Sequence, residues 1–377
     1  MQHEPIVSSR VPFVDLRPIH LPIREAILDD VAALVDGGVF LNGPENEEFE
    51  EAFADYCGTA HCVGVSSGLD ALRLALIAGG IEAGDEVIVP AHTFIATFEA
   101  VTQAGGVPVP VDATVRDYNM DVDAASAAVT RRTHFFLPVH LYGQLADVRA
   151  LRPIAERQGL GIVEDACQAH GADRDGVRAG TAGLAAAFSF YPAKNLGAIG
   201  DAGALVTNDA NIARRARALR EHGEVEKYRS LEPGYTARLD TLQAIVLLRK
   251  LRLLDGWNAE RAWAAAFYGE ALRGVGDLRL PAVPSGSRPV WHLYVVRTAD
   301  PSALAAHLTA SGIESGRHYP EPPHLSRAYA PLGYGQGDFP VAEALCRETL
   351  SLPLFPGITE EQLERTVAAV RAYFDGG

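Results

Sequence analysis

Between Cys62 and Thr207 the chain alternates short apolar runs with segments of helical character, and this alternation restricts its fold more than any other feature. The apolar runs are residues 62–65, 87–90, 107–111, 135–139, 161–164, 185–190 and 204–207. Helical segments fill most of the intervals, for example residues 148–158 and 211–220. Continuous apolar strands joined through helices are typical of a parallel sheet that helices cover on both faces. We predict an α/β fold with a large, mostly parallel sheet flanked by helices, and ligands bound at the carboxyl ends of its strands.

The segment before this region predicts an arm and two helices. Residues 1–20 contain several prolines and little periodicity, so we expect an arm that lies on the surface. Residues 21–36 have helical periodicity. Phe49, Phe53 and Tyr56 mark one face of a second helix.

The last third of the chain predicts a smaller domain. A helix at residues 239–254 leaves the sheet region, and we expect Asp255-Gly256 to break it. The elements expected after the break are a helix at 259–272, a strand at 291–296 and helices at 302–310, 341–349 and 360–374. A chain of 377 residues has room for two domains. We therefore expect a large domain over residues 1–254, which includes the arm, and a small C-terminal α/β domain over residues 255–377.

Charge and cysteine usage argue against several classes of protein. The chain has 48 acidic and 33 basic residues, and its net charge of −15 opposes broad binding to nucleic acid or to an anionic membrane. The four cysteines have no paired Cys-x-x-Cys spacing, so we expect reduced thiols and no metal site. The N-terminus lacks the pattern of a secretory signal, and no apolar stretch is long enough to span a bilayer. We therefore expect a cytoplasmic protein.

Lys194 is the first candidate for chemistry. It lies in a stretch at residues 189–203 that follows an apolar run, and only three of the 33 basic residues are lysines. A lysine amine becomes nucleophilic when an apolar or cation-rich pocket lowers its pKa. The alternative is a surface lysine in a glycine-rich loop, which is the commoner case for a lysine taken alone.

Polar and planar side chains follow three other strands. Asp165 comes at the end of the run at residues 161–164, and Gln168 follows three residues later. The small residues between Gly64 and Gly68 lead into a helix, whose first N–H groups favour a phosphate. Phe94 lies one turn after another strand, where it can stack on a flat ring. The alternatives are a helix N-cap for Asp165, a plain turn at Gly68 and a core aromatic at Phe94.

Together these features match the needs of one cofactor. Pyridoxal 5′-phosphate requires an amine for a Schiff base, a carboxylate at its ring nitrogen, a cradle for its phosphate and a stacking partner. The sequence offers a candidate for each, and we predict that the protein binds this cofactor.

Ordered motifs extend this prediction over nearly the whole chain. They are residues 11–16, 41–44, 65–72, 90–94, 138–144, 164–166, 189–203, 238–240 and 316–320. With these motifs the chain resembles the DegT/StrS family of sugar aminotransferases. The resemblance implies the aspartate-aminotransferase fold, called fold type I, in a homodimer whose active sites lie at the subunit interface, with the cofactor between a large and a small domain.

The resemblance also implies roles for single residues. Lys194 would form the Schiff base, Asp165 would hold the pyridinium nitrogen, Gln168 would bind the ring hydroxyl oxygen and Phe94 would stack on the ring. The residues implied for the phosphate are Gly68, Leu69, Ser189 and, from the neighbouring subunit, a residue of the 236–238 loop such as Arg238. Two positions depart from the commonest family pattern, because Leu69 stands where many relatives have threonine and Thr236 stands where many have asparagine.

The reaction that the resemblance implies moves an amino group from glutamate to a keto group of a nucleotide-linked sugar. Leu69-Asp70 after Gly68 and residues 168–171 resemble relatives that aminate C3 of dTDP-linked sugars more than those that aminate C4, which favours a dTDP-3-keto-6-deoxy sugar. Cyclitol ketones are the alternative, since they are also substrates in this family. The diphosphate of a nucleotide-linked sugar requires positive or polar partners, and Arg317, His318, Tyr319 and residues 220–227 are candidates. Simple surface charge is the alternative for the cationic members of this group.

Three other functions are weighed against this one. A dehydratase of the same fold would carry histidine at the position of Lys194. A non-catalytic sensor would bind the cofactor or the sugar without turnover, which an intact pair of Lys194 and Asp165 opposes. A nicotinamide-dependent epimerase would require a Gly-x-Gly-x-x-Gly fingerprint at the first strand, where only Gly64 and Gly68 are glycines.

Overall fold

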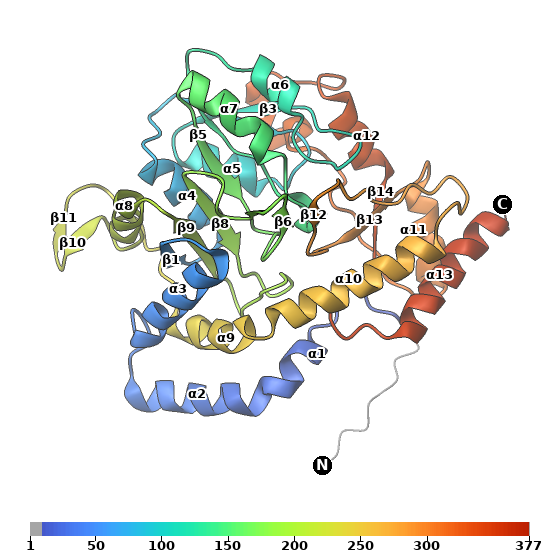
Figure 1. The fold of residues 1–377 in the computed structure, drawn as a ribbon, viewed down its shortest axis with the longest axis horizontal. Coiled ribbons are helices and arrows are strands. Elements are labelled where there is room, and N and C mark those ends of the chain that lie inside the picture. The colour runs from blue at the N-terminus through green and yellow to red at the C-terminus, as the bar shows by residue number, and fades with distance from the viewer. Residues whose placement is uncertain (1–9, 377) are drawn as a thin grey trace.

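A computed structural model describes residues 10–376. The large sheet consists of β1 (His61–Val65), β2 (Glu86–Pro90), β3 (Val107–Val111), β4 (Thr133–Phe136), β5 (Gly161–Asp165), β8 (Ala185–Ser189) and β9 (Gly203–Thr207). Its strand order is β1-β9-β8-β5-β4-β2-β3. Neighbours from β8 to β3 are parallel, while β9 runs antiparallel to both β8 and β1. The prediction of a mostly parallel sheet is confirmed (Figure 1).

Helices cover both faces of this sheet. Those around it are α3 (Pro44–Cys57), α4 (Gly68–Ala78), α5 (Ala96–Gln103), α6 (Val122–Ala127), α7 (Val148–Gln158), α8 (Ala210–Arg220) and α9 (Thr241–Leu251). On one face Val63 and Val65 pack with α4, α5 and α8, whereas Cys62, directly before Val63, packs with α3 and α9 on the other face. Successive strand residues point to opposite sides, so an apolar run without polar alternation supplies two cores at once.

The C-terminal part forms a second core around a two-stranded sheet. Its elements are α10 (Leu254–Ala271), β13 (Tyr294–Arg297), α11 (Pro301–Ala310), α12 (Pro340–Glu348), β14 (Thr349–Leu352) and α13 (Glu360–Asp375). Strands β13 and β14 are antiparallel, and their buried residues pack with α10, α11 and α13. The predicted boundary between residues 254 and 255 falls at the start of α10 and stays a prediction.

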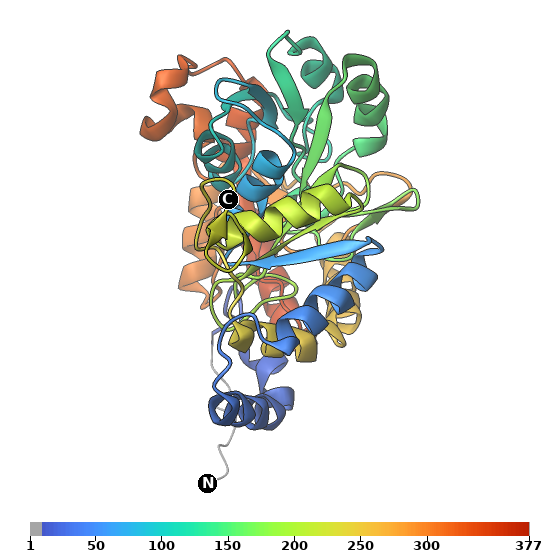
Figure 2. The same cartoon turned by 90° about the vertical axis from the view of Figure 1, so that its left-hand side faces the viewer.

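Several smaller elements complete the chain. Two helices, α1 (Arg17–His20) and α2 (Arg24–Gly37), precede α3. A three-stranded sheet contains β12 (Ser287–Arg288), β6 (Asp173–Arg174) and β7 (Val177–Arg178), in that order, and a hairpin contains β10 (Glu224–Glu226) and β11 (Arg229–Ser230). Four short 3-10 turns include Leu141–Gly143. The hairpin stands away from the body beside α8, and α2 lies along the edge below α9 (Figures 1 and 2).

The structure corrects three details of the sequence prediction. Asp255 and Gly256 do not break a helix but lie in the first turn of α10, and the interruption comes earlier, at Arg252 and Leu253. One glycine costs a helix only about 1 kcal/mol, and burial of Leu254 and Trp257 outweighs that cost.

The second correction concerns the expected helix at residues 341–349. It ends at Glu348, and Thr349 begins β14, a strand that periodicity missed because its four residues are all buried. The third concerns the arm. Residues 1–9 lie outside the described residues, but Val11 is fully buried and pairs with Ile313, so this part of the arm is packed into the C-terminal core and not on the surface.

Candidate active site

A cavity of about 480 Å³ opens at the carboxyl ends of β5 and β8, as predicted for this class of fold. Two groups of residues surround it. We call the first the sheet wall, formed by Gly68, Leu69, Asp165, Gln168, Ser189 and Lys194. We call the second the C-terminal wall, formed by His292, Leu293, His318, Tyr319 and Leu354. Phe13 and Phe94 also line the cavity.

Lys194 projects from the loop at residues 189–203 and is half-buried in the cavity. Burial lowers the pKa of its amine, while Cys167 and Asp165 act in the opposite direction. At a given pH a larger fraction of this amine is therefore neutral than in a surface lysine. A neutral amine can attack a carbonyl or accept a proton. The surface-lysine alternative does not describe this environment.

Two side chains of α9 and the carbonyl oxygen of Val290 hold the loop that carries Lys194. Lys250 Nζ donates to the carbonyl oxygen of Gly197, and the N–H of Ile199 donates to Gln243 Oε1 at 3.0 Å. Asn195 Nδ2 donates to the carbonyl oxygen of Val290 at 2.8 Å. These contacts fix the backbone on which Lys194 stands.

Asp165 ends β5 with its carboxylate buried at the cavity. Oδ2 accepts a hydrogen bond from Thr97 Oγ1 at 3.0 Å, and Oδ1 accepts from the N–H of Cys167 at 3.2 Å. No helix begins at Asp165, so the alternative of a helix N-cap is wrong. Both partners donate to the carboxylate and fix its orientation at the cavity.

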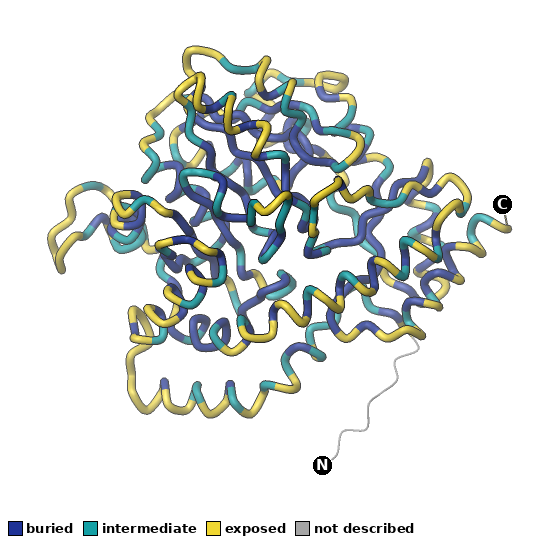
Figure 3. Tube along the Cα trace, in the orientation of Figure 1, coloured by how far each residue is buried: buried dark blue, intermediate teal, exposed yellow. Residues whose placement is uncertain are grey.

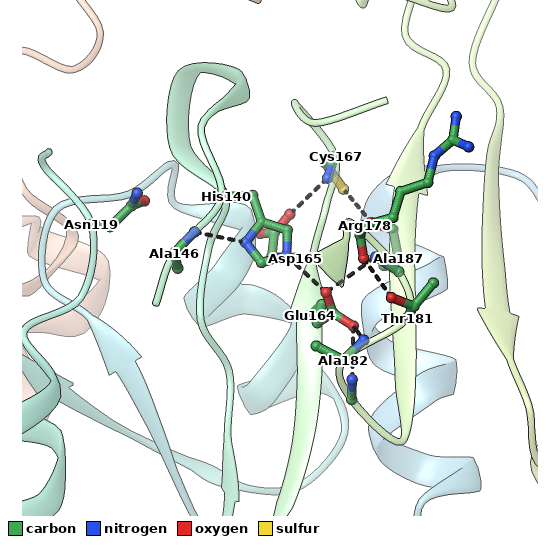
Figure 4. A network of polar contacts seen from close by, with 12 residues as sticks. Asn119, His140, Ala146, Glu164, Asp165, Cys167, Arg178, Thr181, Ala182 and Ala187 are labelled. Atoms are coloured by element: carbon green, nitrogen blue, oxygen red, sulfur yellow. Dashed lines mark hydrogen bonds and ion pairs between the residues drawn. The ribbon is translucent and has the colours of Figure 1, made fainter. Parts of the chain in front are cut away.

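Glu164, the residue before Asp165, lies on the opposite face of β5. Glu164 is fully buried and lies 2.9 Å from His140 Nε2, and the N–H groups of Gly180, Ala182 and Gly183 also donate to it (Figure 4). Burial raises the pKa of Glu164, but these hydrogen bonds outweigh it and leave the pKa below its ordinary value. Glu164 is satisfied within the protein, whereas Asp165 faces the cavity.

Gln168 connects the two walls. Its Oε1 accepts from the N–H of Tyr142 at 2.7 Å, and its Nε2 donates to Tyr319 Oη at 3.0 Å. Burial raises the pKa of Tyr319, so its hydroxyl stays protonated and can donate to a ligand. The Phe94 ring is half-exposed and lies 5.3 Å from the Tyr319 ring, measured between centroids. The alternative of a fully buried core aromatic does not hold for Phe94.

The start of α4 forms a narrow cradle beside Lys194. The Ser67 side chain accepts from the N–H of Asp70 and caps the helix. A Cβ atom on Gly68 would lie 2.6 Å from Ser189 Cβ and 2.8 Å from Cys167 Sγ, so the backbone can lie this close only because residue 68 is glycine. A helix N-terminus with small residues fits an anionic group such as a phosphate.

Other predicted site residues lie elsewhere or differ in charge. Arg317 does not line the cavity, because its guanidinium donates to the carbonyl oxygens of Cys346 and Arg347 at the end of α12. Burial and the charge of Lys194 lower the pKa of His318 to about 4, so this ring contributes no positive charge at neutral pH. The role predicted for His318 as a cation is therefore not supported.

Arg238 and residues 220–227 also lie away from the cavity of their own subunit. Arg238 pairs with Glu221, and Arg220 pairs with Glu50 and with the carbonyl oxygen of Gly64. In the same region the Lys227 amine lies 5.3 Å from the centre of its neighbouring tyrosine ring, and no acidic partner is recorded for it within residues 10–376.

Sequence reasoning missed several residues at the cavity. Thr97 holds Asp165, and Arg261 is buried with Nη1 3.1–3.3 Å from the carbonyl oxygens of Trp291, His292 and Leu354. An arginine at helical spacing in α10 gives no signal of its own in the sequence. Thr97 could have been predicted as a candidate, because it follows strand β2 as Phe94 does.

The residues present fit pyridoxal phosphate. A lysine with a lowered pKa, a buried carboxylate at a strand end, a glycine-dependent cradle at a helix N-terminus and a half-exposed aromatic ring share one cavity on an α/β fold. This fold and site define a pyridoxal-phosphate-dependent aminotransferase. The chain belongs to the DegT/DnrJ/EryC1/StrS aminotransferase family, whose model matches residues 22–371.

Similar proteins cover nearly the whole chain. It is 49% identical to "Erythromycin biosynthesis sensory transduction protein EryC1" of Saccharopolyspora erythraea, over 96% of this chain and 99% of that one. It is 48% identical to "dTDP-3-amino-3,4,6-trideoxy-alpha-D-glucose transaminase" of Streptomyces venezuelae, over 97% of each.

Solved structures agree with this assignment. The crystal structure of S. venezuelae DesV in complex with a ketimine intermediate is similar at a TM-score of 0.95 and 48% identity, over 97% of this chain and 99% of that one. The structure of NtdA from Bacillus subtilis with bound cofactor PMP is similar at a TM-score of 0.91 and 30% identity, over 99% of this chain and 87% of that one. Relatives and site together indicate pyridoxal phosphate as the cofactor.

Proposed function

We propose that the protein transfers an amino group from glutamate to the keto group of a nucleotide-linked sugar, most specifically a dTDP-3-keto-6-deoxy sugar. The observation that carries this proposal is the convergence of Lys194 and Asp165 on one cavity at the carboxyl ends of β5 and β8. The similarity to sugar transaminases over nearly the full length supports the class of substrate.

We propose these roles for the sheet wall. Lys194 Nζ would hold the cofactor covalently, Asp165 would pair with its ring nitrogen, and Gln168 would bond its ring hydroxyl oxygen. Phe94 would stack on the ring. The residues proposed for the phosphate are Gly68 and Leu69, through their N–H groups, and Ser189, through its hydroxyl. When bound, the cofactor supplies an electron sink that stabilises negative charge at the substrate carbon.

The residues of the chain perform the proton transfers and the positioning. Lys194 Nζ would take the proton from the donor α-carbon, and its lowered pKa favours the neutral amine that this step requires. Thr97 and the N–H of Cys167 hold the Asp165 carboxylate in the orientation in which it would pair with the ring nitrogen.

Tyr319 lines the cavity and can donate a hydrogen bond, and Arg261 and Lys194 are the two basic residues other than histidine among those that line it. We therefore propose that a second subunit contributes to this cavity. Its 236–238 loop, with Arg238, would contact the cofactor phosphate, and its residues 220–227, with Lys227, would supply cations for the diphosphate.

Exposed apolar side chains support a homodimer. Leu28 and Val35 on α2 and Phe40 after it are 48%, 62% and 54% exposed, and Tyr228 and Leu231 near the hairpin are 86% and 69% exposed. Figure 3 shows the exposed outer side of α2 and of the hairpin. Large apolar side chains left exposed on an element favour an interface between protein chains.

Two findings bear on location. No helix within residues 10–376 has both the length and the apolar character needed to cross a bilayer. All four cysteines are free, in agreement with the prediction of reduced thiols, and we propose that the protein works in the cytoplasm.

One spectroscopic experiment tests the proposed function. The purified protein, supplied with pyridoxal phosphate, should absorb in the visible range, and glutamate should shift that absorption to the ultraviolet. Addition of a keto-sugar nucleotide should then restore the visible absorption. A protein that neither binds pyridoxal phosphate nor responds to glutamate would falsify the proposal, and a panel of 3-keto and 4-keto sugar nucleotides identifies the substrate.

A sensory role is the second candidate, because one relative carries that name. The same experiment distinguishes the two. A sensor would bind the cofactor or the sugar nucleotide but would not return to the visible form through repeated cycles of glutamate and keto sugar. A dehydratase is disfavoured, since the position that carries histidine in such enzymes is Lys194 here.

A further inference from the structure

A line of buried polar groups joins the two walls behind the cavity. Cys346 Sγ lies 3.5 Å from His92 Nδ1, and His92 Nε2 lies 2.9 Å from Tyr142 Oη. The Tyr142 hydroxyl donates to the carbonyl oxygen of His318. His92 and Tyr142 belong to the large sheet domain, whereas Cys346 lies in α12 and His318 in the C-terminal wall.

The hydrogen bonds along this line have one consistent direction. A carbonyl oxygen only accepts, so the Tyr142 hydroxyl must donate to His318. His92 Nε2–H then donates to Tyr142 Oη, and Nδ1 accepts from the Cys346 thiol. This assignment requires a neutral imidazole, and burial lowers the pKa of His92 to about 3.

The same tyrosine reaches the C-terminal wall by a second route. Its backbone N–H donates to Gln168 Oε1, and Gln168 Nε2 donates to Tyr319 Oη. Two neighbouring residues of the wall, His318 and Tyr319, are therefore both bound to a turn that follows β4. Asp112, after β3, additionally accepts from the N–H groups of Val341 and Ala342 and so holds the start of α12.

We propose that His92 and Tyr142 are positioning residues that hold the His318–Tyr319 segment against the large sheet and so set the place of the Tyr319 hydroxyl in the cavity, where it would contact the sugar nucleotide. Neither residue lies where the chemistry would occur. They act through the backbone of His318, and the bond from Tyr142 to the His318 carbonyl fixes the tautomer of His92.

Substitution of Tyr142 tests this proposal against a matched control. Tyr142→Phe removes the hydroxyl and keeps the ring. Tyr268→Phe also removes one buried bond from a tyrosine hydroxyl to a carbonyl, that of Pro353 at 3.0 Å, but within the C-terminal core and away from the cavity. Both variants lose stability, so a purely structural role would make them alike.

The first measurement is amide hydrogen exchange of the peptide that contains residues 316–320, which requires neither cofactor nor activity. Loss of a buried hydrogen bond should speed exchange in this peptide about tenfold in Tyr142→Phe and leave it unchanged in Tyr268→Phe. This measurement stays informative even if the proposed function is wrong.

The second measurement rests on the proposed function and uses the holoenzyme. In Tyr142→Phe the KM for the keto-sugar nucleotide should rise about tenfold, while the rate at which glutamate converts the visible form changes less than twofold. His92→Leu should give the same pattern, and His92→Gln, which keeps an N–H donor, should restore part of the affinity. Equal exchange of residues 316–320 and equal KM in the Tyr142 and Tyr268 variants would overturn the proposal. If Tyr142→Phe does not fold, the two His92 variants decide by the same criteria.

Discussion

The two walls of the cavity are built in different ways. The sheet wall presents Asp165 and Lys194 at or just after the ends of neighbouring strands, where the register of β5 and β8 fixes the backbone. The C-terminal wall presents His318 and Tyr319 on a segment held by side chains of residues more than 150 positions away, Tyr142 and Gln168. The residues proposed for the chemistry thus lie on the part fixed by many backbone hydrogen bonds, and those proposed for recognition lie on the part fixed by a few side chains.

This difference predicts different sensitivities. A change in the sheet wall should alter the chemical step or cofactor binding, and a change in the C-terminal wall should alter affinity for the sugar or the stability of the fold. Substitutions in the two walls therefore test whether the division holds.

The largest effect is expected at Lys194. Lys194→Ala should lower kcat at least about 10⁴-fold, because it removes the amine that holds the cofactor and moves the proton. Borohydride should no longer fix the cofactor to the protein. Lys194→Arg keeps the charge without a nucleophilic amine and should be as inactive, so measurable turnover in the arginine variant contradicts the assignment.

The next largest effect is expected when Asp165 and Glu164, on opposite faces of β5, are each replaced by the matching amide. Asp165→Asn should lower kcat about 10²–10³-fold with little loss of stability, because it removes a charge aimed into the cavity. Glu164→Gln should do the reverse. It should destabilise the fold by about 2 kcal/mol through its buried hydrogen bonds, with kcat per folded molecule nearly unchanged. Steady-state kinetics and urea unfolding of both variants check this, and a similar loss of kcat in both would break the comparison.

A smaller effect is expected in the cradle. Gly68→Ala places a Cβ at 2.6 Å from that of Ser189, and the forced shift should weaken cofactor binding about tenfold to a hundredfold. Titration of the apoprotein with pyridoxal phosphate, followed by absorbance, measures the Kd. Gly256→Ala, in α10 with no atom within 4 Å of the new Cβ, is the control and should bind the cofactor normally. Unchanged affinity in Gly68→Ala would show that the cradle does not hold the phosphate.

Acid should lower the free energy of unfolding by similar amounts through one buried histidine behind each wall. Burial lowers the pKa of His92, behind the C-terminal wall, and of His170, behind the sheet wall, to about 3. An unfolded histidine has a pKa of about 6.5, so below that pH the unfolded chain binds more protons and stability falls as pH drops toward 3. Each histidine should contribute about 1 kcal/mol of the loss between pH 7 and pH 5.5. Urea unfolding at the two values measures it, and His92→Gln and His170→Gln should each reduce the difference. A pH-independent free energy of unfolding would contradict these pKa values.

The smallest effect is expected at Arg317. Its bonds to the carbonyl oxygens of Cys346 and Arg347 predict that Arg317→Ala costs about 1 kcal/mol of stability and changes the KM for the sugar nucleotide less than about threefold. A tenfold rise in KM at unchanged stability would instead support the substrate contact predicted from the sequence.

Much of the sheet wall could be predicted from the sequence because its signals are local. An apolar run marks a strand, and the residue that follows it lies at the carboxyl edge of the sheet, which was sufficient for Asp165, Gln168 and Gly68. The helix break expected at Asp255-Gly256 was wrong, because helix propensity is weak compared with burial of the residues around it. Strand β14 was missed because four buried residues carry no distinguishing period.

The sequence by itself determined which residues could bind pyridoxal phosphate and which strands they follow, because a short stretch of sequence is enough to recognise a strand and the residue after it. The tertiary structure alone decided that Arg317 turns to the end of α12, that burial leaves His318 neutral, and that His92 and Tyr142 support the C-terminal wall. These facts depend on contacts such as that of His92 with Cys346, 254 positions apart, and on desolvation, which exists only when many distant segments pack around one side chain.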